Sequence, residues 1–265
     1  MYNVIRNSQE RSKETRIVLS EERLDEITRI VNERGSITNQ ELVQIIGVSE
    51  STIRRDITAL AEDNRIIRVH GGAMSLNSGV SMEDSDINAR REQCGEEKKQ
   101  IAKYAASLIN NNDLVYIDAG TTTEYMIDYI TAMGATFVTN ALSHAVQLAK
   151  RGFNVYIIGG QIKSITEAII DSEAIISLTK YNFTKGFFGT NGISRDRGLT
   201  TPDVREADIK KFAMSRCTKK YVLCDSSKFN KISKATFAMP DEVTVITERI
   251  PDNFRDYKIK EADEL

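Results

Sequence analysis

Residues 47–60 read GVSESTIRRDITAL and place two arginines side by side, directly before an aspartate. The glycine, valine and serine at the start are typical of a tight turn, and Ser49 is a favourable cap for the helix that follows. Ile53, Ile57 and Leu60 recur at helical spacing and predict the buried face of that helix. The paired arginines fall on the opposite face, where burial does not explain them.

The segments on either side complete a small domain. Residues 20–35 (SEERLDEITRIVNERG) carry apolar residues at three-to-four spacing between a capping serine and a terminating glycine, and residues 37–47 (ITNQELVQIIG) predict a second short helix. Residues 65–74 (RIIRVHGGAM) alternate like a strand and contain a Gly-Gly pair. Three helices followed by a short hairpin predict a winged helix-turn-helix.

The outward face of the third helix is suited to reading DNA. Base edges are contacted by the first turns of a recognition helix, which makes Ser51, Thr52 and Arg55 the best candidates for base contacts. Arg54 is equally suited to a phosphate, and Asp56 to orienting one arginine through a charge-assisted hydrogen bond. In full, the candidate DNA contacts are Thr38, Ser49, Ser51, Thr52, Arg54, Arg55, Arg68 and His70.

The wing residues Arg65, Arg68 and His70 are expected to reach the DNA backbone or the minor groove. A plainer explanation stays open on spacing alone, because a solvated helix with routine ion pairs carries the same residues.

The charge balance limits how this domain could bind DNA. The whole chain has a net charge of −2, and residues 1–76 contain 11 Lys and Arg against 12 Asp and Glu, a balance of −1. Without a broad positive field, the arginines must act by position. We therefore expect a homo-oligomer, a dimer or a tetramer, that binds double-stranded operator DNA with more than one copy of the site.

The remaining totals exclude several classes of protein. Hydrophobic residues make up 40% of the chain, but no apolar run approaches the roughly 20 residues of a membrane span. The N-terminus, MYNVIRNSQERSKETRIV, is polar and does not resemble a signal peptide, which favours a cytoplasmic protein. Cys94, Cys217 and Cys224 have no CxxC spacing and no histidine cluster nearby, so we expect free thiols, no metal site and no cofactor.

From residue 96 onward, apolar runs alternate with amphipathic stretches. The strand-like runs are residues 114–118, 136–140, 154–160, 185–192, 220–225 and 243–247. Strand-helix alternation predicts an α/β domain with a Rossmann-like parallel sheet and helices on both faces. Ligands in such sheets bind beyond the carboxyl ends of the strands.

The sequence therefore predicts five segments. They are a flexible N-terminal extension (1–19), a winged helix-turn-helix domain (20–75), a linker (76–95), a sensor and oligomerisation domain (96–250) and a C-terminal tail (251–265).

The stretch YIDAGTTTEYMIDYI, residues 116–130, predicts a strand, a turn and a helix. Backbone N–H groups at a helix N-terminus together with three hydroxyls favour an anion such as phosphate. A simple helix cap is the alternative, although one threonine is enough for a cap. No Gly-Lys-Thr follows, so this is not a Walker A loop.

Other predicted strand ends also carry polar residues. Carboxylates and amides suit sugar hydroxyls, and lysines suit a phosphate. Together they give the candidate effector-binding residues Asp118, Gly120, Thr121, Thr122, Thr123, Asn140, Gly160, Gln161, Lys163, Thr190, Asn191, Gly192, Asp203, Glu206, Lys210, Asp225 and Lys228.

The N-terminal motifs resemble those of a known family. Residues 48–60 and 68–73 match the VSxxTIRRDLxxL helix and the RxHGGA wing of the DeoR/GlpR family of bacterial sugar-metabolism regulators. Two departures are small: Ile57 stands where leucine is usual, and EDNRII (62–67) stands where the family often has a glycine turn. The resemblance continues to about residue 247.

In that family the C-terminal half resembles the ribose-5-phosphate isomerase fold and senses phosphorylated sugars. The matching motifs are DAGTTT (118–123), TN (139–140), GG (159–160), TNG (190–192), DxxEAxxK (203–210) and DSSK (225–228). Within the family the chain looks most like fructose-operon repressors, which implies fructose 1-phosphate as effector. The GGxxxxITEA piece also resembles the lactose phosphotransferase-system repressors, which respond to tagatose 6-phosphate.

Three functions remain to be compared. The resemblance implies a repressor, not an enzyme, whose DNA binding is controlled by a sugar phosphate. An isomerase is the second hypothesis, since Asp203, Glu206 and Lys210 are suited to acid-base work, but a fold does not carry its chemistry with it. A structural DNA-binding protein without a ligand is the third, and the polar strand ends argue against it.

Overall fold

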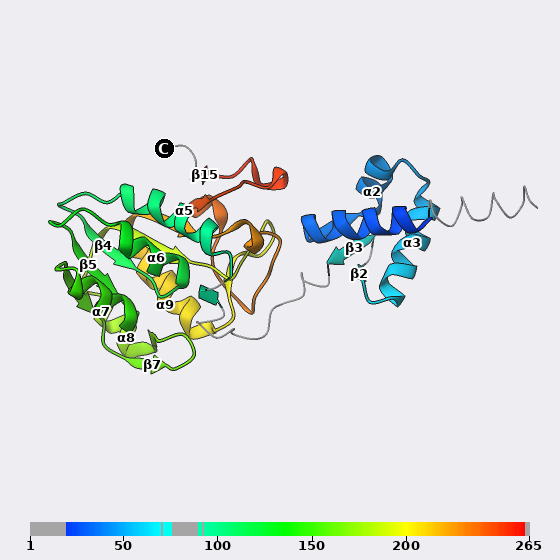
Figure 1. The fold of residues 1–265 in the computed structure, drawn as a ribbon. Helices are drawn as coiled ribbons and strands as arrows, with labels where there is room; N and C mark the ends of the chain where they lie inside the picture. The colour runs from blue at the N-terminus through cyan, green and yellow to red at the C-terminus, as the bar shows by residue number, and fades with distance from the viewer. Residues whose placement is uncertain (1–19, 70, 76–89, 92, 263–265) are drawn as a thin grey trace, which may run out of the picture. The chain divides into compact units, whose positions relative to one another are not determined.

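The computed structural model describes residues 20–69, 71–75, 90–91 and 93–262. The chain divides into two compact units, Met1–Gly79 and Val80–Leu265, which Figure 1 shows in blue-cyan and in green-to-red. The expected N-terminal extension, His70 and most of the expected linker lie outside the described residues.

The first unit is a winged helix-turn-helix. After a helix over residues 20–34 come β1 (Ser36–Thr38), α2 (Asn39–Ile46), α3 (Glu50–Glu62), β2 (Ile66–Val69) and β3 (Gly72–Ser75). The three strands form an antiparallel sheet in the order β1-β3-β2. The strand β1 was not predicted. Because it occupies Ser36–Thr38, the second helix begins at Asn39 and not at residue 37 as predicted.

The core of this unit confirms the apolar stripe of α3. Ile53, Ile57 and Leu60 are buried and pack with Ile27 of the first helix and Leu42 of α2. Between the helices, Gly47 has φ +75°, a left-handed conformation that ends α2 and that side chains rarely adopt. This turn fixes how α3 leaves α2 and therefore which of its faces points outward.

The second unit is built on a seven-stranded parallel sheet in the order β15-β14-β12-β9-β4-β5-β6. Its strands are β4 (Leu114–Ile117), β5 (Thr136–Thr139), β6 (Asn154–Ile157), β9 (Phe183–Gly189), β12 (Cys217–Leu223), β14 (Thr244–Thr247) and β15 (Ile259–Glu261). The predicted parallel sheet is thus confirmed.

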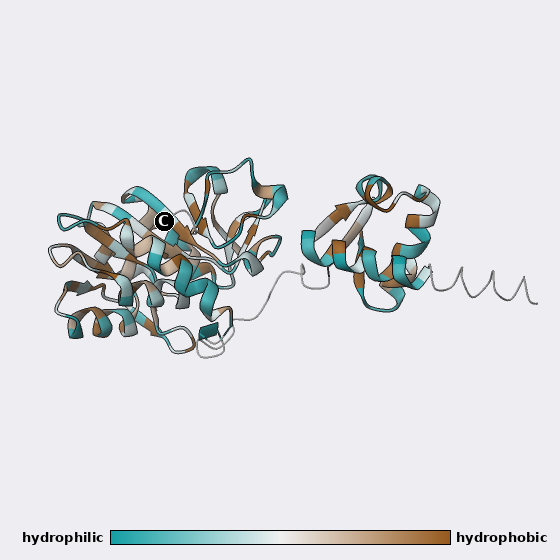
Figure 2. Ribbon diagram, turned by 45° about the horizontal axis from the view of Figure 1, so that its top comes forward, coloured by the Kyte–Doolittle hydropathy of each residue, from teal (hydrophilic) through white to brown (hydrophobic). Residues whose placement is uncertain are grey.

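Helices cover both faces of this sheet. Adjacent residues of a strand point to opposite faces, so Val115 and Tyr116 of β4 enter different cores. The core on the Val115 face includes α5 (Gly95–Ser107), α6 (Thr121–Tyr129) and α7 (Leu142–Lys150), and the other includes α8 (Ser172–Leu178) and α9 (Val204–Ser215). Figure 2 shows the mixed polar and apolar colouring expected of such amphipathic helices.

Several short elements were not predicted. A hairpin of β7 (Gln161–Lys163) and β8 (Ala168–Ile170) follows β6, and a second sheet has the order β10-β11-β13, formed by Gly192–Ser194, Gly198–Thr201 and Ala235–Ala238. Three 3-10 turns lie at Ser226–Lys228 (η2), Pro240–Glu242 (η3) and Asp252–Phe254 (η4).

The expected C-terminal tail instead belongs to the sheet. β15 pairs with β14 in parallel, and Phe254 is fully buried in the core. The described part of residues 251–265 therefore extends the second unit.

The order of the strands locates a crevice. From β4 the chain moves one way to β5 and β6, and later returns to place β9 on the other side of β4. Where the direction of winding reverses, the loops after neighbouring strands separate and leave room for a ligand. The loops after β4 and β9, residues 118–120 and 190–191, flank this point.

Candidate functional site

The outward face of α3 presents the paired arginines to solvent. Ser51, Arg54 and Arg55 are exposed, and Thr52 is half-buried. Arg54 forms an ion pair of 2.6 Å with Glu50, but both side chains are largely exposed at 65% and 49%. Exposed pairs of this kind are weak, so a DNA phosphate can compete for Arg54.

Two of the predicted DNA contacts also cap helices. Ser49 Oγ accepts a hydrogen bond from the Thr52 N–H at 3.3 Å and lies 2.9 Å from both the Ser51 and Thr52 hydroxyls. Thr38 caps α2 in a reciprocal arrangement with Glu41, and hydrogen bonds from Thr38 lower the pKa of that carboxyl. These caps secure the helix starts that a DNA backbone would approach.

Asp56 does not orient the paired arginines. Its carboxylate accepts hydrogen bonds from Arg23 Nε at 2.7 Å and from Arg23 Nη2 at 3.1 Å, which raises the pKa of Arg23. Asp56 lies on the buried side of α3, beside Ile53 and Ile57, so it faces the first helix. The expected contact with Arg54 or Arg55 is therefore wrong, and Asp56 has a structural role.

The wing supplies one described candidate with a clear position. Arg68 of β2 is exposed, and its Nη1 donates to the Thr58 hydroxyl on α3 at 3.1 Å. Arg65 pairs with Asp25 at 2.6 Å. Arg68 thus lies beside α3, while His70 lies outside the described residues.

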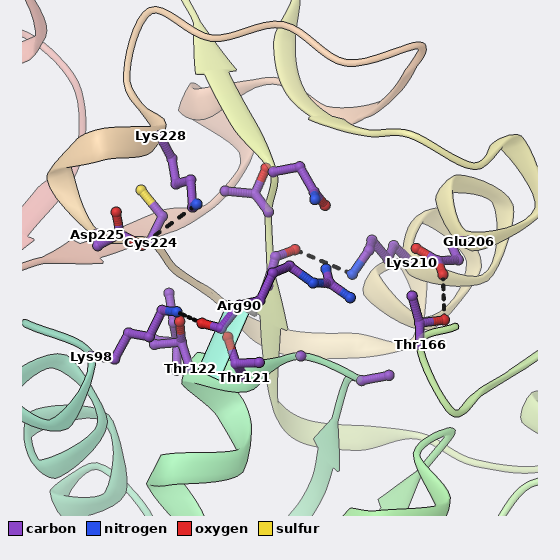
Figure 3. Close-up of a pocket in the computed structure, with 16 residues that line it drawn as sticks. Arg90, Lys98, Thr121, Thr122, Thr166, Glu206, Lys210, Cys224, Asp225 and Lys228 are labelled. Carbon is purple, nitrogen blue, oxygen red and sulfur yellow. Dashed lines mark hydrogen bonds and ion pairs between the residues drawn. The ribbon is translucent and has the colours of Figure 1, made fainter. Parts of the chain in front are cut away.

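A pocket opens at the crevice of the second unit (Figure 3). Nine of the predicted effector residues line it: Gly120, Thr121, Thr122, Thr190, Asn191, Glu206, Lys210, Asp225 and Lys228. The seven other lining residues, which sequence reasoning missed, are Arg90, Lys98, Ala119, Thr166, Gly189, Leu223 and Cys224. Strand-end loops that are distant in the sequence therefore meet in one place.

The N-terminus of α6 forms one wall of the pocket. Gly120 occupies the cap position and has no side chain with which to bond the first N–H groups of the helix. Thr121 and Thr122 line the pocket. Thr123 does not, because its hydroxyl donates to the carbonyl oxygens of Asp118 and Gly120 at 2.7 and 2.8 Å. Two hydroxyls and a helix N-terminus therefore face the pocket, in place of the three hydroxyls expected.

Positive charge dominates the lining. Four cationic side chains (Arg90, Lys98, Lys210 and Lys228) face two carboxylates (Glu206 and Asp225). Such an excess of cations beside a helix N-terminus favours an anionic ligand.

Two of these cations are buried and held in place. Lys210, 5% exposed, forms an ion pair with Asp118 and donates to the Gly189 carbonyl at 3.2 Å. Burial raises the pKa of Asp118 despite the nearby ammonium. Lys98, 3% exposed, donates to the Arg90 carbonyl oxygen, and its burial lowers its pKa.

The carboxylates are held by networks. Glu206 accepts hydrogen bonds from Thr166 at 2.9 Å, Lys163 at 3.1 Å and Thr201 at 3.2 Å. Asp225 accepts from the N–H and hydroxyl of Ser227 and lies 3.9 Å from Lys228. Fixed carboxylates of this kind can accept hydrogen bonds from sugar hydroxyls.

Four predicted residues lie behind the lining and support it. Asp118 holds Lys210, and Asn140 accepts a hydrogen bond from the Ala119 N–H at 2.9 Å. Lys163 bridges Asp203 and Glu206 at 3.0 and 3.1 Å. Burial acts to raise the pKa of Asp203, but hydrogen bonds from Arg205 and Lys163 outweigh it and lower that pKa. These residues position the loop and Glu206 and do not line the pocket.

Three other predicted residues have structural positions. A Cβ at Gly160 would approach the Ile169 side chain to 2.8 Å, and a Cβ at Gly192 would approach the Lys231 carbonyl oxygen to 2.4 Å, so close packing explains both glycines. The Gln161 side chain is exposed at the start of β7. Gly160 and Gln161 do not line the pocket, because they follow the edge strand β6, two strands from β4.

One missed residue had a readable signal. Lys98 precedes Ile101 and Ala105 on the buried stripe of α5, and a lysine on an apolar stripe is unusual unless it has a partner. Arg90 gave no such signal, because it falls in a polar stretch without periodicity.

Among the residues that the structure describes, no group of three or more His, Cys, Asp or Glu side chains is arranged to hold a metal ion. Among the same residues, no helix has the length and apolar character required to cross a membrane.

Comparison with known proteins identifies both units. Residues 23–79 match the DeoR-like helix-turn-helix domain, and residues 93–249 match the DeoR C terminal sensor domain. The chain is 38% identical over 231 residues to the uncharacterized HTH-type transcriptional regulator FruR of Bacillus subtilis, covering 87% of this chain and 91% of that protein. It is 34% identical to the lactose phosphotransferase system repressor of Streptococcus mutans, covering 92% and 98%.

Solved structures show more distant similarity. Ribose 5-phosphate isomerase A from Methanocaldococcus jannaschii is 14% identical with a TM-score of 0.37, over 51% of this chain and 54% of that chain. The eIF2B delta chain from Chaetomium thermophilum is 20% identical with a TM-score of 0.38, over 52% and 50%. The two family domains and the full-length relatives together show that the chain is a DNA-binding transcriptional regulator of the DeoR family and not an enzyme.

Proposed function

We propose that this regulator is a repressor of a sugar-utilisation operon and that a phosphorylated sugar, fructose 1-phosphate, controls its DNA binding. The observation that carries the proposal is the convergence of the α6 N-terminus with four cationic side chains in the pocket. A phosphate would lie against Thr121 and Thr122, since both the helix N-terminus and the cations favour an anion there.

The sugar would lie toward the polar side of the pocket. Asn191, Glu206 and Asp225 offer oxygen acceptors and an amide to its hydroxyls. Effector binding needs no cofactor in this proposal. The effector changes DNA affinity only to the extent that it binds one arrangement of the sensor better than the other.

The choice of sugar rests on the resemblance of the sequence motifs. The likeness of residues 158–170 and 190–203 to fructose-operon repressors implies fructose 1-phosphate. The likeness of residues 159–168 to lactose phosphotransferase-system repressors makes tagatose 6-phosphate the second candidate. The same pocket chemistry suits both ligands, because both combine a phosphate with sugar hydroxyls.

On DNA, α3 would lie in the major groove, with Ser51, Thr52 and Arg55 at base edges and Arg54 and Arg68 on phosphates. The near-neutral charge of residues 1–76 supports binding as a dimer or tetramer on spaced half-sites. Sedimentation with and without operator DNA tests the oligomer, and a single copy bound per operator would contradict it.

One calorimetric comparison tests the effector. The full chain is titrated with fructose 1-phosphate, tagatose 6-phosphate, free fructose and inorganic phosphate, and each ligand is then added to a gel-shift titration with operator DNA. We expect the tightest binding and the largest change in operator affinity from fructose 1-phosphate. A response to tagatose 6-phosphate alone would select the second candidate, and no response to either would reject the sensor proposal.

A further inference from the structure

Arg90 and Arg91 are the first described residues after the connector, which is the stretch of residues 76–89 that joins the two units in the sequence. Arg91 is anchored to α6, because its guanidinium donates twice to Glu124, both at 2.9 Å, and its carbonyl oxygen accepts from the Tyr125 hydroxyl at 3.2 Å. Arg91 is therefore fastened to α6, the helix whose N-terminus lines the pocket.

The backbone of Arg90 is held by a pocket residue. Lys98 Nζ donates to the Arg90 carbonyl oxygen, as Figure 3 shows. Lys98 also lines the pocket. A phosphate there would attract its ammonium group more strongly than the neutral Arg90 carbonyl does and so weaken that hydrogen bond.

The side chain of Arg90 also lines the pocket, and its Nε is a buried donor without a hydrogen-bond partner among the described residues. A buried N–H without an acceptor is unfavourable, and an anion in the pocket would supply the acceptor. Arg90 thus lines the pocket with its side chain, is bonded through its carbonyl to a pocket residue, and directly follows the connector in the chain.

We propose that Arg90 is the coupling residue, which binds the effector phosphate through its guanidinium and transmits pocket occupancy to the connector through its backbone. This inference rests on the proposed function and names the residue through which it is regulated. The phosphate draws the guanidinium inward and weakens the hold of Lys98 on the Arg90 carbonyl. Both changes act where the connector leaves the sensor.

Two other pocket cations, Lys210 and Lys228, lack this connection. Lys210 is on α9 and bonded to Asp118, and Lys228 lies in η2 beside Asp225. They can strengthen effector binding, but neither is next to residues 76–89 in the chain. This difference provides a matched control, because Arg90 and Lys228 are both pocket cations and only one is continuous with the connector.

The experiment uses the full chain, operator DNA and fructose 1-phosphate. For the wild type, Arg90→Gln and Lys228→Gln, the operator Kd is measured without and with saturating effector, and effector Kd is measured by calorimetry. We expect the wild-type operator Kd to change by about 10–100-fold. For Arg90→Gln we expect a change below about 3-fold even at saturation. Lys228→Gln should weaken effector binding by roughly 10-fold and keep the wild-type change at saturation.

Tagatose 6-phosphate replaces fructose 1-phosphate if only that sugar acts on the wild type. If saturating effector changes the operator Kd of Arg90→Gln as much as that of the wild type, the inference is overturned and the proposed function stands. If Lys228→Gln loses this effector-induced change as fully as Arg90→Gln does, the inference is also overturned, because the loss of any pocket cation would then have the same effect. A wild type that responds to neither sugar overturns the proposed function together with the inference. If circular dichroism shows that Arg90→Gln does not fold, Arg90→Lys is measured in its place, because lysine keeps the positive charge but lacks Nε. The inference is overturned if the effector changes the operator Kd of Arg90→Lys as much as that of the wild type.

Discussion

Replacing Asp56 by asparagine should loosen α3 without removing a DNA contact. The Arg23 guanidinium donates to both oxygens of Asp56, at 2.7 and 3.1 Å. Hydrogen bonds to charged groups contribute about 1.5–3 kcal/mol when well buried. The two side chains are 23% and 10% exposed, so water replaces part of that interaction, and we expect a loss of about 1–2 kcal/mol. In a domain of this size that corresponds to roughly 5–15 °C in Tm.

Hydrogen exchange in the full chain measures this loss locally, as faster exchange of the α3 amides. In a double-mutant cycle with Arg23→Gln, the coupling free energy between the two residues should account for most of the stability lost in Asp56→Asn. Arg54→Gln is the matched control, because it breaks the exposed pair with Glu50 and should cost no more than about 0.5 kcal/mol. The reasoning is refuted if Asp56→Asn leaves exchange unchanged and weakens operator binding as much as Arg55→Ala does.

Three other predictions concern DNA, phosphate and pH. Arg55→Ala should cost about 1–3 kcal/mol at one base position in gel shifts with single-base operator variants, whereas an equal loss on every sequence would indicate a phosphate contact. Thr122→Ala should weaken fructose 1-phosphate binding by roughly 10-fold in calorimetry and leave the Tm unchanged. Thr123→Ala should instead lower the free energy of unfolding by about 1–3 kcal/mol, because the Thr123 hydroxyl bonds two loop carbonyls. An equal loss of Tm in both variants would contradict this difference. Burial lowers the pKa of His144 to about 4. The unfolded chain therefore binds more protons between pH 4 and about 6.5, and stability falls as the pH drops through that window, by about 2 kcal/mol between pH 7 and 5. His144→Leu should remove that part of the pH dependence in urea unfolding, and an unchanged difference would argue against it.

The parallel sheet could be predicted from sequence because interior strands such as β4, β5 and β14 are mostly buried and the strands alternate with amphipathic helices. β4 and β9 contain short apolar runs between polar loops, and such runs can be recognised in a single sequence. The β7–β8 hairpin and the β10-β11-β13 sheet could not, because their strands of three or four residues carry no periodicity that distinguishes them from loops. β15 was missed for the same reason.

The pocket was predicted in part, for a related reason. A polar residue after a strand lies at the carboxyl edge of the sheet, which is a local property, and this is why Thr122 and Lys228, which line the pocket, could be named from the sequence. Strand order is not local. Gln161 follows β6 and was expected at the pocket, but β6 is an edge strand. Arg90 reaches the pocket only because the chain docks against α6 after the connector, and nothing in the local sequence indicates that docking.

The pairing of β4 with β9 determines when the pocket can form during synthesis of the chain. Val115 pairs with Lys185, and the pocket also needs Asp225 and Lys228, so a growing chain has no effector site until most of it has been synthesised. A ligand that binds only the completed sheet stabilises it by mass action, by about 2.7 kcal/mol at a hundred times its Kd. Under the proposed function, the sugar phosphate that controls operator binding should then also slow unfolding and proteolysis. A cell rich in the sugar phosphate would hold more copies of the regulator as well as copies in a different state.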